Sequence, residues 1–446
     1  MNKVVKASPT KEFFVNMLVR DILLKQAIIE LIDNSIDGAR NIRKNNQYLG
    51  LYIRVGFDKN KFTIEDNCGG IPLDVAANYA FRFGRPKTVE NSDTETTGIF
   101  GIGMKRALFK IGNNFSIHSI TKTTEFQLNL DVKEWLKKDD NDWDFNFSSY
   151  EENMNNLEEK TGTRIEVTDL NSEIAAELDS EEFENEVIEH IQRRVGLDIA
   201  YGIVIVVNDK NLVGNNIILI DNEEIEPVKE EYQDGDINVK ILSGIAPREG
   251  KKYPPEKAGW YIYCNGRLVV AADKTSLTTW KDMENKSSGV VFHHNYAGFR
   301  GIVYFSSKHP EKLPWNTTKT GLDETSLVYL RAREKMLEIF KITKNILDDI
   351  RKNTEDKDDG IEETIAKMRG TEMTIENVNK VKENRTMNIK NVSITTIPNV
   401  TINYKKPKEE VEELKKVLGV KSYREVGEKT FEYYKDYSCL LYTSPS

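Results

Sequence analysis

The sequence has few cysteines, no excess of positive charge and no long apolar run. Its three cysteines, Cys68, Cys264 and Cys439, have no paired spacing, which argues against a disulfide framework or a zinc site and suits a reducing cytosol. The formal net charge of −9 gives no global electrostatic reason to bind nucleic acid or an anionic membrane, although a local basic groove stays open. No apolar segment approaches the roughly 20 residues that span a bilayer, and the first residues contain no signal-peptide core. We therefore expect a cytoplasmic protein with no membrane partner.

The composition that is present describes a soluble globular protein of two or three domains. With 446 residues, of which 39% are hydrophobic and 30% charged, the chain is long enough to bury sizeable cores. Its last eight residues, Cys439-Leu-Leu-Tyr-Thr-Ser-Pro-Ser446, resemble the translation of a transposon-type sequencing adapter. We therefore expect residues 439–446 to be an artefact and the natural chain to continue past Ser438; the alternative is a genuine tail.

Residues 27–39 predict a buried helix with a single polar stripe. At about 100° per residue, Glu30, Asp33, Asn34 and Asp37 fall within one arc of roughly 100°, while the rest of the circumference is mostly alanine, isoleucine and leucine. A helix that is apolar nearly all round is buried, so the stripe should face an internal cavity. Carboxylates crowded there repel one another and are costly to desolvate without a cation. The pattern favours a metal-assisted site with a carboxylate base; the alternative is a solvated charged face.

A glycine-rich motif follows a predicted hairpin. Residues 52–57 and 62–66 alternate with a period of two, which is typical of paired strands. The second strand runs into Asp66-Asn-Cys-Gly-Gly70, where the paired glycines allow a ligand to approach the backbone closely. A carboxylate at this strand end could accept a hydrogen bond from an exocyclic amine. An ordinary glycine turn is the alternative.

A second glycine motif, Gly98-Ile-Phe-Gly-Ile-Gly103, leads into a helix expected over residues 104–111. The unpaired amides and the dipole at such a helix start make an anion site. The spacing G-x-x-G-x-G, without a preceding parallel strand, is neither a Rossmann turn nor a P-loop. Before it, residues 83–97 are polar and charged and are interpreted as a mobile loop.

The remaining sequence predicts further strands and helices and one acidic insertion. Residues 138–159 are predicted to be a solvated excursion, and Thr161-Gly-Thr163 precedes another alternating strand. The strand at 203–207 is expected to begin a second α/β unit, which ends in a long helix over about 324–352. Past it, a strand-like stretch at 395–407 and two short helices resemble a ribbon-helix-helix module; a linker or another interaction segment is the alternative. The two helices are expected at residues 408–417 and 423–437.

Four motifs stand in order along residues 10–170: Glu30-Leu-Ile-Asp-Asn34, Asp66-Asn-Cys-Gly-Gly70, the glycines from Gly98 to Gly103, and Thr161-Gly-Thr163. Together they resemble the GHKL ATPases, the superfamily of DNA gyrase B subunits, the ninety-kilodalton heat-shock chaperone, histidine kinases and MutL. The resemblance implies a Bergerat-type fold that binds ATP and Mg²⁺. Phosphoryl transfer to water needs positioning, a metal and a base more than covalent catalysis, which agrees with the polar stripe.

The resemblance also implies roles for single residues. Glu30 matches the general base that orients and deprotonates the attacking water, and Asn34 matches the ligand of Mg²⁺. Asp66 matches the carboxylate that binds the adenine amino group, with Thr163 supporting it, while Gly70 would let the adenine approach closely.

The phosphate side of the site is expected to come from the lid. Gly98, Gly101 and Gly103 match its phosphate-binding glycines, and Lys105 at the helix start is expected to reach a phosphate. Asp33 and Asp37 of the stripe then keep supporting or structural roles.

The second unit resembles a transducer domain. Tyr263-Cys-Asn-Gly-Arg267 and Trp315-Asn-Thr-Thr-Lys-Thr320 are similar to segments of MutL, gyrase B and especially the MORC ATPases. The resemblance makes Lys319 the candidate that reaches across to the γ-phosphate; a solvated loop lysine is the alternative. No histidine-bearing dimerisation helix precedes the ATP motifs, which disfavours a histidine kinase.

These inferences give an α+β protein with ATP hydrolysis as its expected activity. ATP would close the lid, drive homodimerisation and move the second unit as a clamp, with DNA or a protein effector left open as a further partner and a DNA-related or defence process as the setting. A nucleotide-dependent switch with negligible turnover and a heat-shock-type chaperone are the alternatives. The expected organisation is a Bergerat-type ATP-binding α/β sandwich at 1–175, a transducer α/β domain at 176–352, a partly helical, truncated C-terminal segment at 353–438, and the adapter at 439–446.

Overall fold

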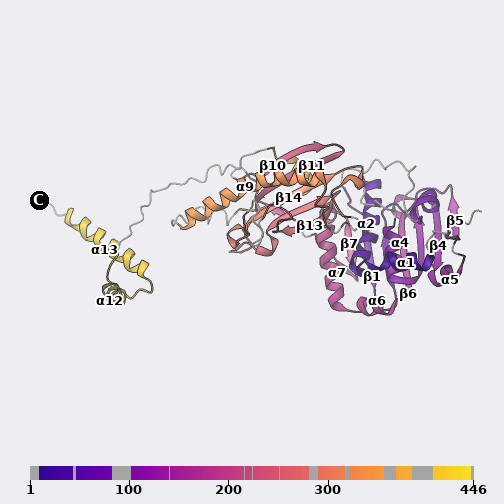
Figure 1. Cartoon of the computed structure of the whole chain (residues 1–446), viewed down its shortest axis with the longest axis horizontal. Helices are drawn as coiled ribbons and strands as arrows, with labels where there is room; N and C mark the ends of the chain where they lie inside the picture. Colours follow the sequence, from indigo (N-terminus) through magenta and orange to yellow (C-terminus); the bar gives the residue numbers. More distant parts are fainter. Residues whose placement is uncertain are drawn as a thin grey trace, which may run out of the picture. The chain divides into compact units, whose positions relative to one another are not determined.

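The computed structural model divides the chain into two compact units, Met1–Ser393 and Ile394–Ser446 (Figure 1). No helix in the part of the chain that it describes is both long enough and apolar enough to cross a membrane. The described residues are 10–43, 47–82, 102–139, 141–214, 216–222, 225–250, 252–280, 290–316, 319, 321–355, 368–383 and 405–442.

The first unit begins with a mixed sheet that has eight strands among the described residues. Its strands are antiparallel except for one parallel pair, β1 with β7. In sheet order they are β5 (Phe147–Glu152), β4 (Thr124–Asp131), β3 (Gly112–Ile120), β6 (Gly162–Leu170), β2 (Phe62–Asp66), β1 (Tyr52–Phe57), β7 (Val204–Val207) and β8 (Lys210–Asn211).

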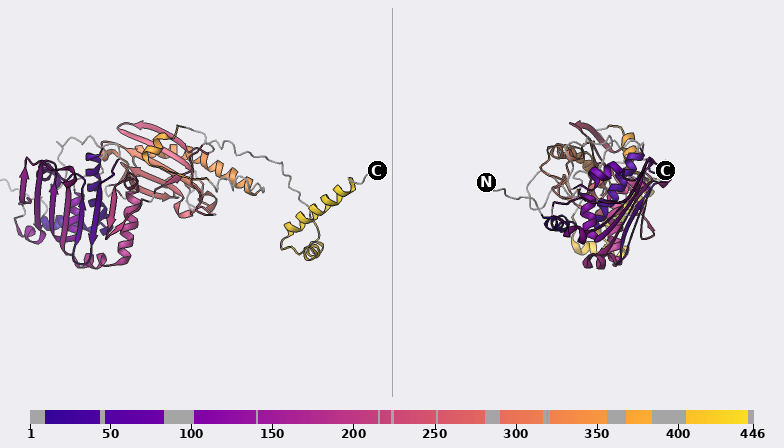
Figure 2. Two further views of the ribbon diagram at one scale, coloured as in Figure 1. Left: turned by 180° about the vertical axis from the view of Figure 1, so that it is seen from behind. Right: turned by 90° about the vertical axis from the view of Figure 1, so that its right-hand side faces the viewer.

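Helices cover one face of this sheet because its strands are apolar on one side only. In β1, Ile53 and Val55 are buried whereas Arg54 between them is exposed. Helices α1 (Lys11–Arg20), α2 (Leu24–Ile42) and α4 (Gly103–Ile111) pack together on the buried side (Figures 1 and 2). The shorter elements around them are α3 (Leu73–Val75), a π-helical turn (Ala76–Ala80), α5 (Val132–Lys137), a 3-10 turn (Glu158–Lys160), α6 (Ser172–Leu178), α7 (Glu181–Arg194) and α8 (Gly196–Ala200).

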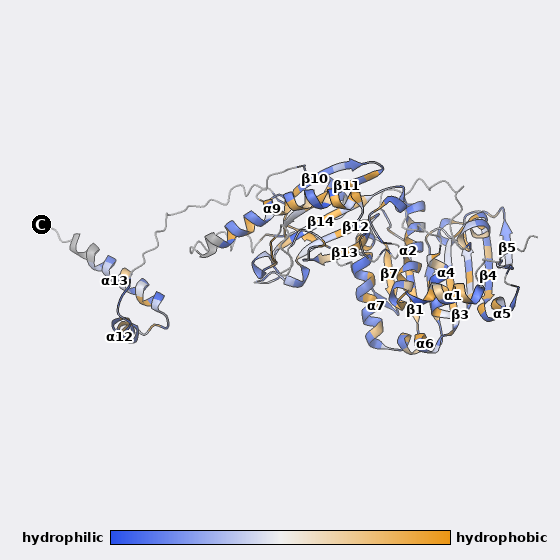
Figure 3. Cartoon of the chain, viewed as in Figure 1, coloured by the Kyte–Doolittle hydropathy of each residue, from blue (hydrophilic) through white to orange (hydrophobic). Residues whose placement is uncertain are grey.

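The same unit contains a second, smaller sheet whose two faces are both covered. Residues of alternating parity in β11 and β14 belong to two separate apolar clusters, one against the long helix α9 (Leu327–Glu355) and one against Met373 and Val378. Figure 3 shows apolar residues following these strands. In sheet order the strands are β10 (Val228–Asp234), β11 (Ile237–Ile245), β14 (Phe299–Ser306), β12 (Gly259–Cys264) and β13 (Arg267–Asp273). Beside them lie the pair β9 (Ile218–Leu219) and β15 (Thr371–Glu372), the 3-10 turns Pro255–Lys257, His294–Tyr296 and Pro310–Lys312, and α11 (Ile375–Lys380).

Two of the sequence predictions differ from these elements. The strand expected to begin the second unit, β7, pairs in parallel with β1 and therefore belongs to the first sheet. The segment predicted to be a solvated excursion is mostly exposed, as expected, but it also contains the edge strand β5, with Phe147 packed edge-to-face on Phe126. The predicted domain limits at 175 and 352 remain predictions.

The second compact unit contains two helices, α12 (Lys408–Leu418) and α13 (Tyr423–Tyr442). Gly419, with φ of 65°, ends α12 in the left-handed conformation that glycine adopts without a Cβ penalty. Glu425 accepts hydrogen bonds from the backbone amides of Lys421 and Ser422 and so caps the start of α13. Both helices were predicted; the strand-like stretch before them lies, up to residue 404, outside the described residues.

Candidate functional site

Helix α2 carries the polar stripe, and its members differ sharply in environment. Asp33 is buried, Glu30 and Asp37 are half-buried, and Asn34 is exposed. The buried apolar face of α2 holds the helix against the sheet, and of these four side chains Asn34 lines a pocket. The stripe therefore does not act as one cluster of four equal groups.

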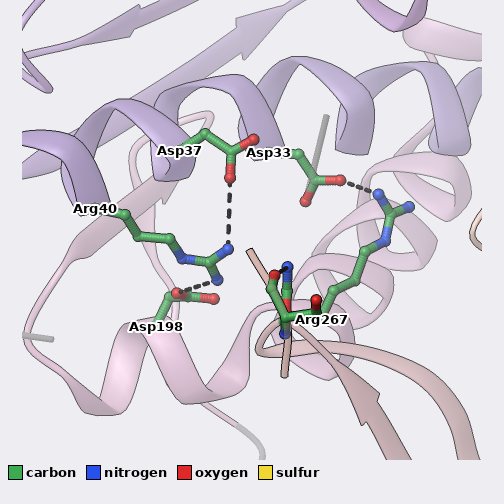
Figure 4. A network of polar contacts seen from close by, with 7 residues as sticks. Asp33, Asp37, Arg40, Asp198 and Arg267 are labelled. Carbon is green, nitrogen blue, oxygen red and sulfur yellow. Dashed lines mark hydrogen bonds and ion pairs between the residues drawn. The ribbon is translucent and has the colours of Figure 1, made fainter. Parts of the chain in front are cut away.

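Two arginines neutralise the carboxylates of Asp33 and Asp37 in the stripe (Figure 4). Arg267 donates to Asp33, while Arg40 contacts Asp37 at 3.4 Å and Asp198 at 3.1 Å. Burial lowers the pKa of Arg40, but the carboxylates of Asp198 and Asp37 outweigh it, so the pKa lies above its ordinary value. A buried carboxylate without such a partner would be strongly destabilising.

Glu30 lies between two cations that come from the second half of the chain. Its Oε1 is 3.6 Å from Nη1 of Arg267 and its Oε2 is 3.5 Å from Nζ of Lys319. Burial lowers the pKa of Lys319, and the charge of Glu30 opposes that change. On its other side Glu30 meets the start of α4, where a Cβ added to Gly103 would lie 2.3 Å from Oε2. The carboxylate is thus held where the helix start and two cations converge.

A pocket beside α2 combines an apolar lining with few polar groups. Its empty volume, which includes space open to solvent, is about 420 Å³. Its apolar lining comes from Leu31, Ile64, Ile71, Met104 and Ile165, and its polar lining includes Asn34, Ser35, Asp66 and Thr163.

Asp66 is the buried carboxylate of this pocket. Its Oδ2 accepts a hydrogen bond of 2.6 Å from Ser35 on α2, and its Oδ1 accepts one of 2.8 Å from the backbone amide of Cys68. Burial raises the pKa of Asp66, and these hydrogen bonds act against the rise. An ionised carboxyl group has about four acceptor positions, so Asp66 retains capacity for a ligand donor.

Gly70 forms the pocket wall where only glycine fits. Its φ is 71°, and a Cβ at this position would lie 2.2 Å from the carbonyl oxygen of Ile120. Beside it, Oγ of Ser119 accepts from the backbone amide of Ile71 at 2.7 Å and lies 3.2 Å from Oγ1 of Thr163. Gly70 and the hydroxyl groups of Ser119 and Thr163 thus allow the three segments that carry these residues to lie close together around the pocket.

We expect Gly70→Ala to lower the free energy of unfolding by about 2 kcal/mol or more, because left-handed torsions and a backbone clash act together. Urea denaturation measures the loss. Gly235→Ala is the matched control, since Gly235 has φ of 60° and nothing within 4 Å of its Cβ position. Equal losses in the two variants would mean that the close approach at Gly70 has no cost.

Only some of the remaining predicted residues can be located in relation to this pocket. Gly98 and Gly101 lie outside the described residues, and Gly103 is the first residue of α4. Lys105 is buried and donates to the carbonyl oxygens of Ala80 and Arg82 at 2.8 and 2.7 Å. Burial lowers the pKa of Lys105 to about 8. Its predicted contact with a phosphate therefore remains a prediction.

Three residues of the site were given no role from the sequence: Ser35, Asp198 and Arg267, although Arg267 ends a segment that was singled out as similar to a transducer. Ser35 belongs to α2 and could have been found from its place beside the stripe. Arg267 follows Asn265-Gly266, a dipeptide that favours a tight hairpin turn, but nothing local indicates which carboxylate it meets. Asp198 carries no local signal that we can identify.

The predicted ligand of a magnesium ion is Asn34. Among the described residues, no group of three or more histidine, cysteine or acidic side chains could hold a metal ion. The exposed amide of Asn34, at the pocket, offers a hard oxygen donor, and Mg²⁺ is commonly held by one or two protein ligands together with phosphates and water.

Comparison with known proteins covers the part of the chain that forms this pocket. Residues 22–163 match the model of a family described as histidine kinase-, DNA gyrase B-, and HSP90-like ATPase. The matched range contains Glu30, Asn34, Asp66, Gly70 and Thr163. No curated protein matches the chain. The match over residues 22–163 supports the GHKL superfamily for this part of the chain and, in general terms, ATP binding and hydrolysis.

Proposed function

We propose that this protein is a Mg²⁺-dependent ATPase in which Glu30 is the general base and Lys319 contacts the terminal phosphate. The observation that carries the proposal is the meeting of Glu30 and Lys319, at 3.5 Å, near a pocket that contains one buried carboxylate. In the proposed mechanism, the contact with Lys319 would hold the carboxylate close to the terminal phosphate.

The proposed binding mode places adenine in the apolar pocket. Asp66 accepts a hydrogen bond from its amino group, Thr163 supports Asp66, and Gly70 lets the ring approach. Asn34 holds Mg²⁺, which when bound neutralises phosphate charge. The glycines Gly98, Gly101 and Gly103 and the lysine Lys105 are assigned to the phosphates.

The finer mechanism that we propose resembles the MORC and MutL ATPases. Lid closure over the nucleotide would favour a homodimer. The part of the chain that contains the second sheet would act as a transducer, because the segment before α9 supplies Lys319 to the site. The expected limits of these two parts stay 1–175 and 176–352, and the setting is a DNA-related or defence process.

Phosphate release from Mg·ATP by the whole chain tests the activity, with and without DNA, and with EDTA as the control. Sedimentation with a non-hydrolysable ATP analogue tests dimerisation. Absence of both binding and turnover would contradict the proposal.

A nucleotide-dependent switch with negligible turnover is the second candidate. It is favoured by the ion pairs of Glu30 with Lys319 and Arg267, because a carboxylate engaged by two cations is not free to contact the attacking water. Tight binding of Mg·ATP without phosphate release would identify this function.

Replacing Lys319 by alanine is expected to lower turnover roughly ten- to a hundredfold, because a cation near the developing phosphate charge is lost. The rate of phosphate release at saturating ATP measures the effect. Lys335→Ala, which breaks an ion pair with Glu230 elsewhere in the same unit, controls for loss of a part-buried ion pair. Equal rates of phosphate release by Lys319→Ala and Lys335→Ala would contradict the assignment of Lys319 to the site.

A further inference from the structure

Arg267 joins the second sheet to α2 through two carboxylates. It is the first residue of β13 and its side chain is 3% exposed. Its Nη1 donates to Asp33 and lies 3.6 Å from Oε1 of Glu30. The two acidic residues are three positions apart and therefore neighbours on one face of the helix. One guanidinium nitrogen thus contacts the proposed base and a buried carboxylate next to it.

The turn that carries Arg267 is itself fixed to the second sheet. Asn265 and Gly266 have φ of 45° and 77°, as the central residues of a tight hairpin turn require. The side-chain amide of Asn265 donates to the carbonyl oxygen of Ser307 and accepts from its backbone amide, both at 2.9 Å. The backbone of Arg267 therefore starts from a rigid position.

The same turn rests against a second arginine of α2. A Cβ added to Gly266 would lie 2.8 Å from Nη2 of Arg40, and Arg40 is held by Asp37 and Asp198. Asp37 lies one helical turn after Asp33. The hairpin turn at Asn265-Gly266 and Arg267 after it therefore meet α2 at two successive turns of the helix. This limits rotation of α2 relative to Arg267.

The two cations on Glu30 differ in how firmly they are held. Arg267 has Asp33 as a second acidic partner, whereas Lys319 has no second carboxylate within ion-pair distance among the described residues. Lys319 also has φ of 53°, an uncommon torsion for a residue with a side chain, and such torsions concentrate at functional sites. Lys319 is therefore suited to exchange Glu30 for a phosphate, while Arg267 stays in place.

We propose that Arg267 is the positioning residue for Glu30, which holds the carboxylate in its catalytic direction after Lys319 has moved to the nucleotide. The inference rests on the proposed function. It assigns to Asn265-Gly266-Arg267 the link by which the second sheet fixes the geometry of the base.

The test compares Arg267→Gln and Arg267→Lys with the control Arg333→Gln. Arg333 is a part-buried arginine that donates to the carbonyl oxygens of Thr278 and Ser276, away from Glu30. For Arg267→Gln we expect kcat to fall at least tenfold while the affinity for Mg·ATP, measured by calorimetry, changes less than threefold, since a small misplacement of a base costs rate and not binding. Arg267→Lys should restore part of kcat because one charge remains.

The outcomes separate this inference from the proposed function. A wild-type chain that neither binds nor hydrolyses Mg·ATP contradicts the proposed function. An active wild type whose Arg267→Gln variant matches Arg333→Gln in kcat overturns the inference. Parallel losses of kcat and ATP affinity overturn it as well, because they would make Arg267 a binding residue. If neither Arg267 variant folds, by circular dichroism, Arg267 is structural and the inference fails.

Discussion

Glu30→Gln is expected to reduce ATP turnover by roughly a thousandfold while leaving Mg·ATP binding intact. General-base catalysis contributes about 10²- to 10⁴-fold, and an amide cannot accept the proton of the attacking water. The amide keeps the size of the carboxyl group, so the contact with the start of α4 is preserved. Phosphate release at saturating ATP gives the rate, and calorimetry gives the affinity.

Loss of the Glu30 charge has a second consequence, for stability. Arg267 keeps Asp33, but Lys319, which is buried, loses its carboxylate partner. An uncompensated buried charge is destabilising, so the melting temperature should fall without nucleotide and recover with it, when phosphate charge replaces Glu30. Glu230→Gln, which removes a similarly buried partner from Lys335, is the control. Unchanged turnover in Glu30→Gln would sink the assignment of the base.

The sequence predicted the elements that have strong local periodicity. The hairpin of β1 and β2, the buried helix α2 and the helix after the second glycine motif follow from alternation and from apolar residues at helical spacing. Helix α1, for example, begins where the hydroxyl oxygen of Thr10 accepts from the amide of Phe13. Helix ends are decided by one hydrogen bond and are harder to locate than helix interiors.

Pairing between distant segments was the part that sequence reasoning could not supply. Periodicity shows that residues 203–207 form a strand but not that β1 is its neighbour. The strand was therefore assigned to the second unit, although it pairs in the first sheet. In the same way, Glu30 and Asp33 were recognised as charges that need a cation, and the expected cation was a metal ion. Arg267 supplies part of that charge from more than 230 positions away, a contact that only the folded chain brings about.

The pocket suggests the clearest test of nucleotide recognition, the replacement of Asp66 by asparagine. We expect the affinity for Mg·ATP to fall by more than about a hundredfold, because a buried polar group matched to a ligand donor discriminates strongly when the match is lost. In the wild type both oxygens already accept hydrogen bonds, from Ser35 and from the amide of Cys68. Whichever way the new asparagine side chain is turned, its amide nitrogen would face one of these two donors or the adenine amino group.

The geometry also indicates how the variant would rearrange. The amide of Cys68 cannot become an acceptor, so Oδ1 of the new side chain should stay toward it and the nitrogen should turn toward Ser35, whose hydroxyl oxygen can accept. The adenine amino group would then meet a donor. Asp273→Asn is the matched control, since Asp273 also accepts from a hydroxyl group and a backbone amide but lies on the second sheet. Calorimetry with Mg·ATP measures both variants. If Asp66→Asn binds as tightly as Asp273→Asn, adenine does not occupy this pocket, and the proposed binding mode is wrong even where Glu30 proves to be the base.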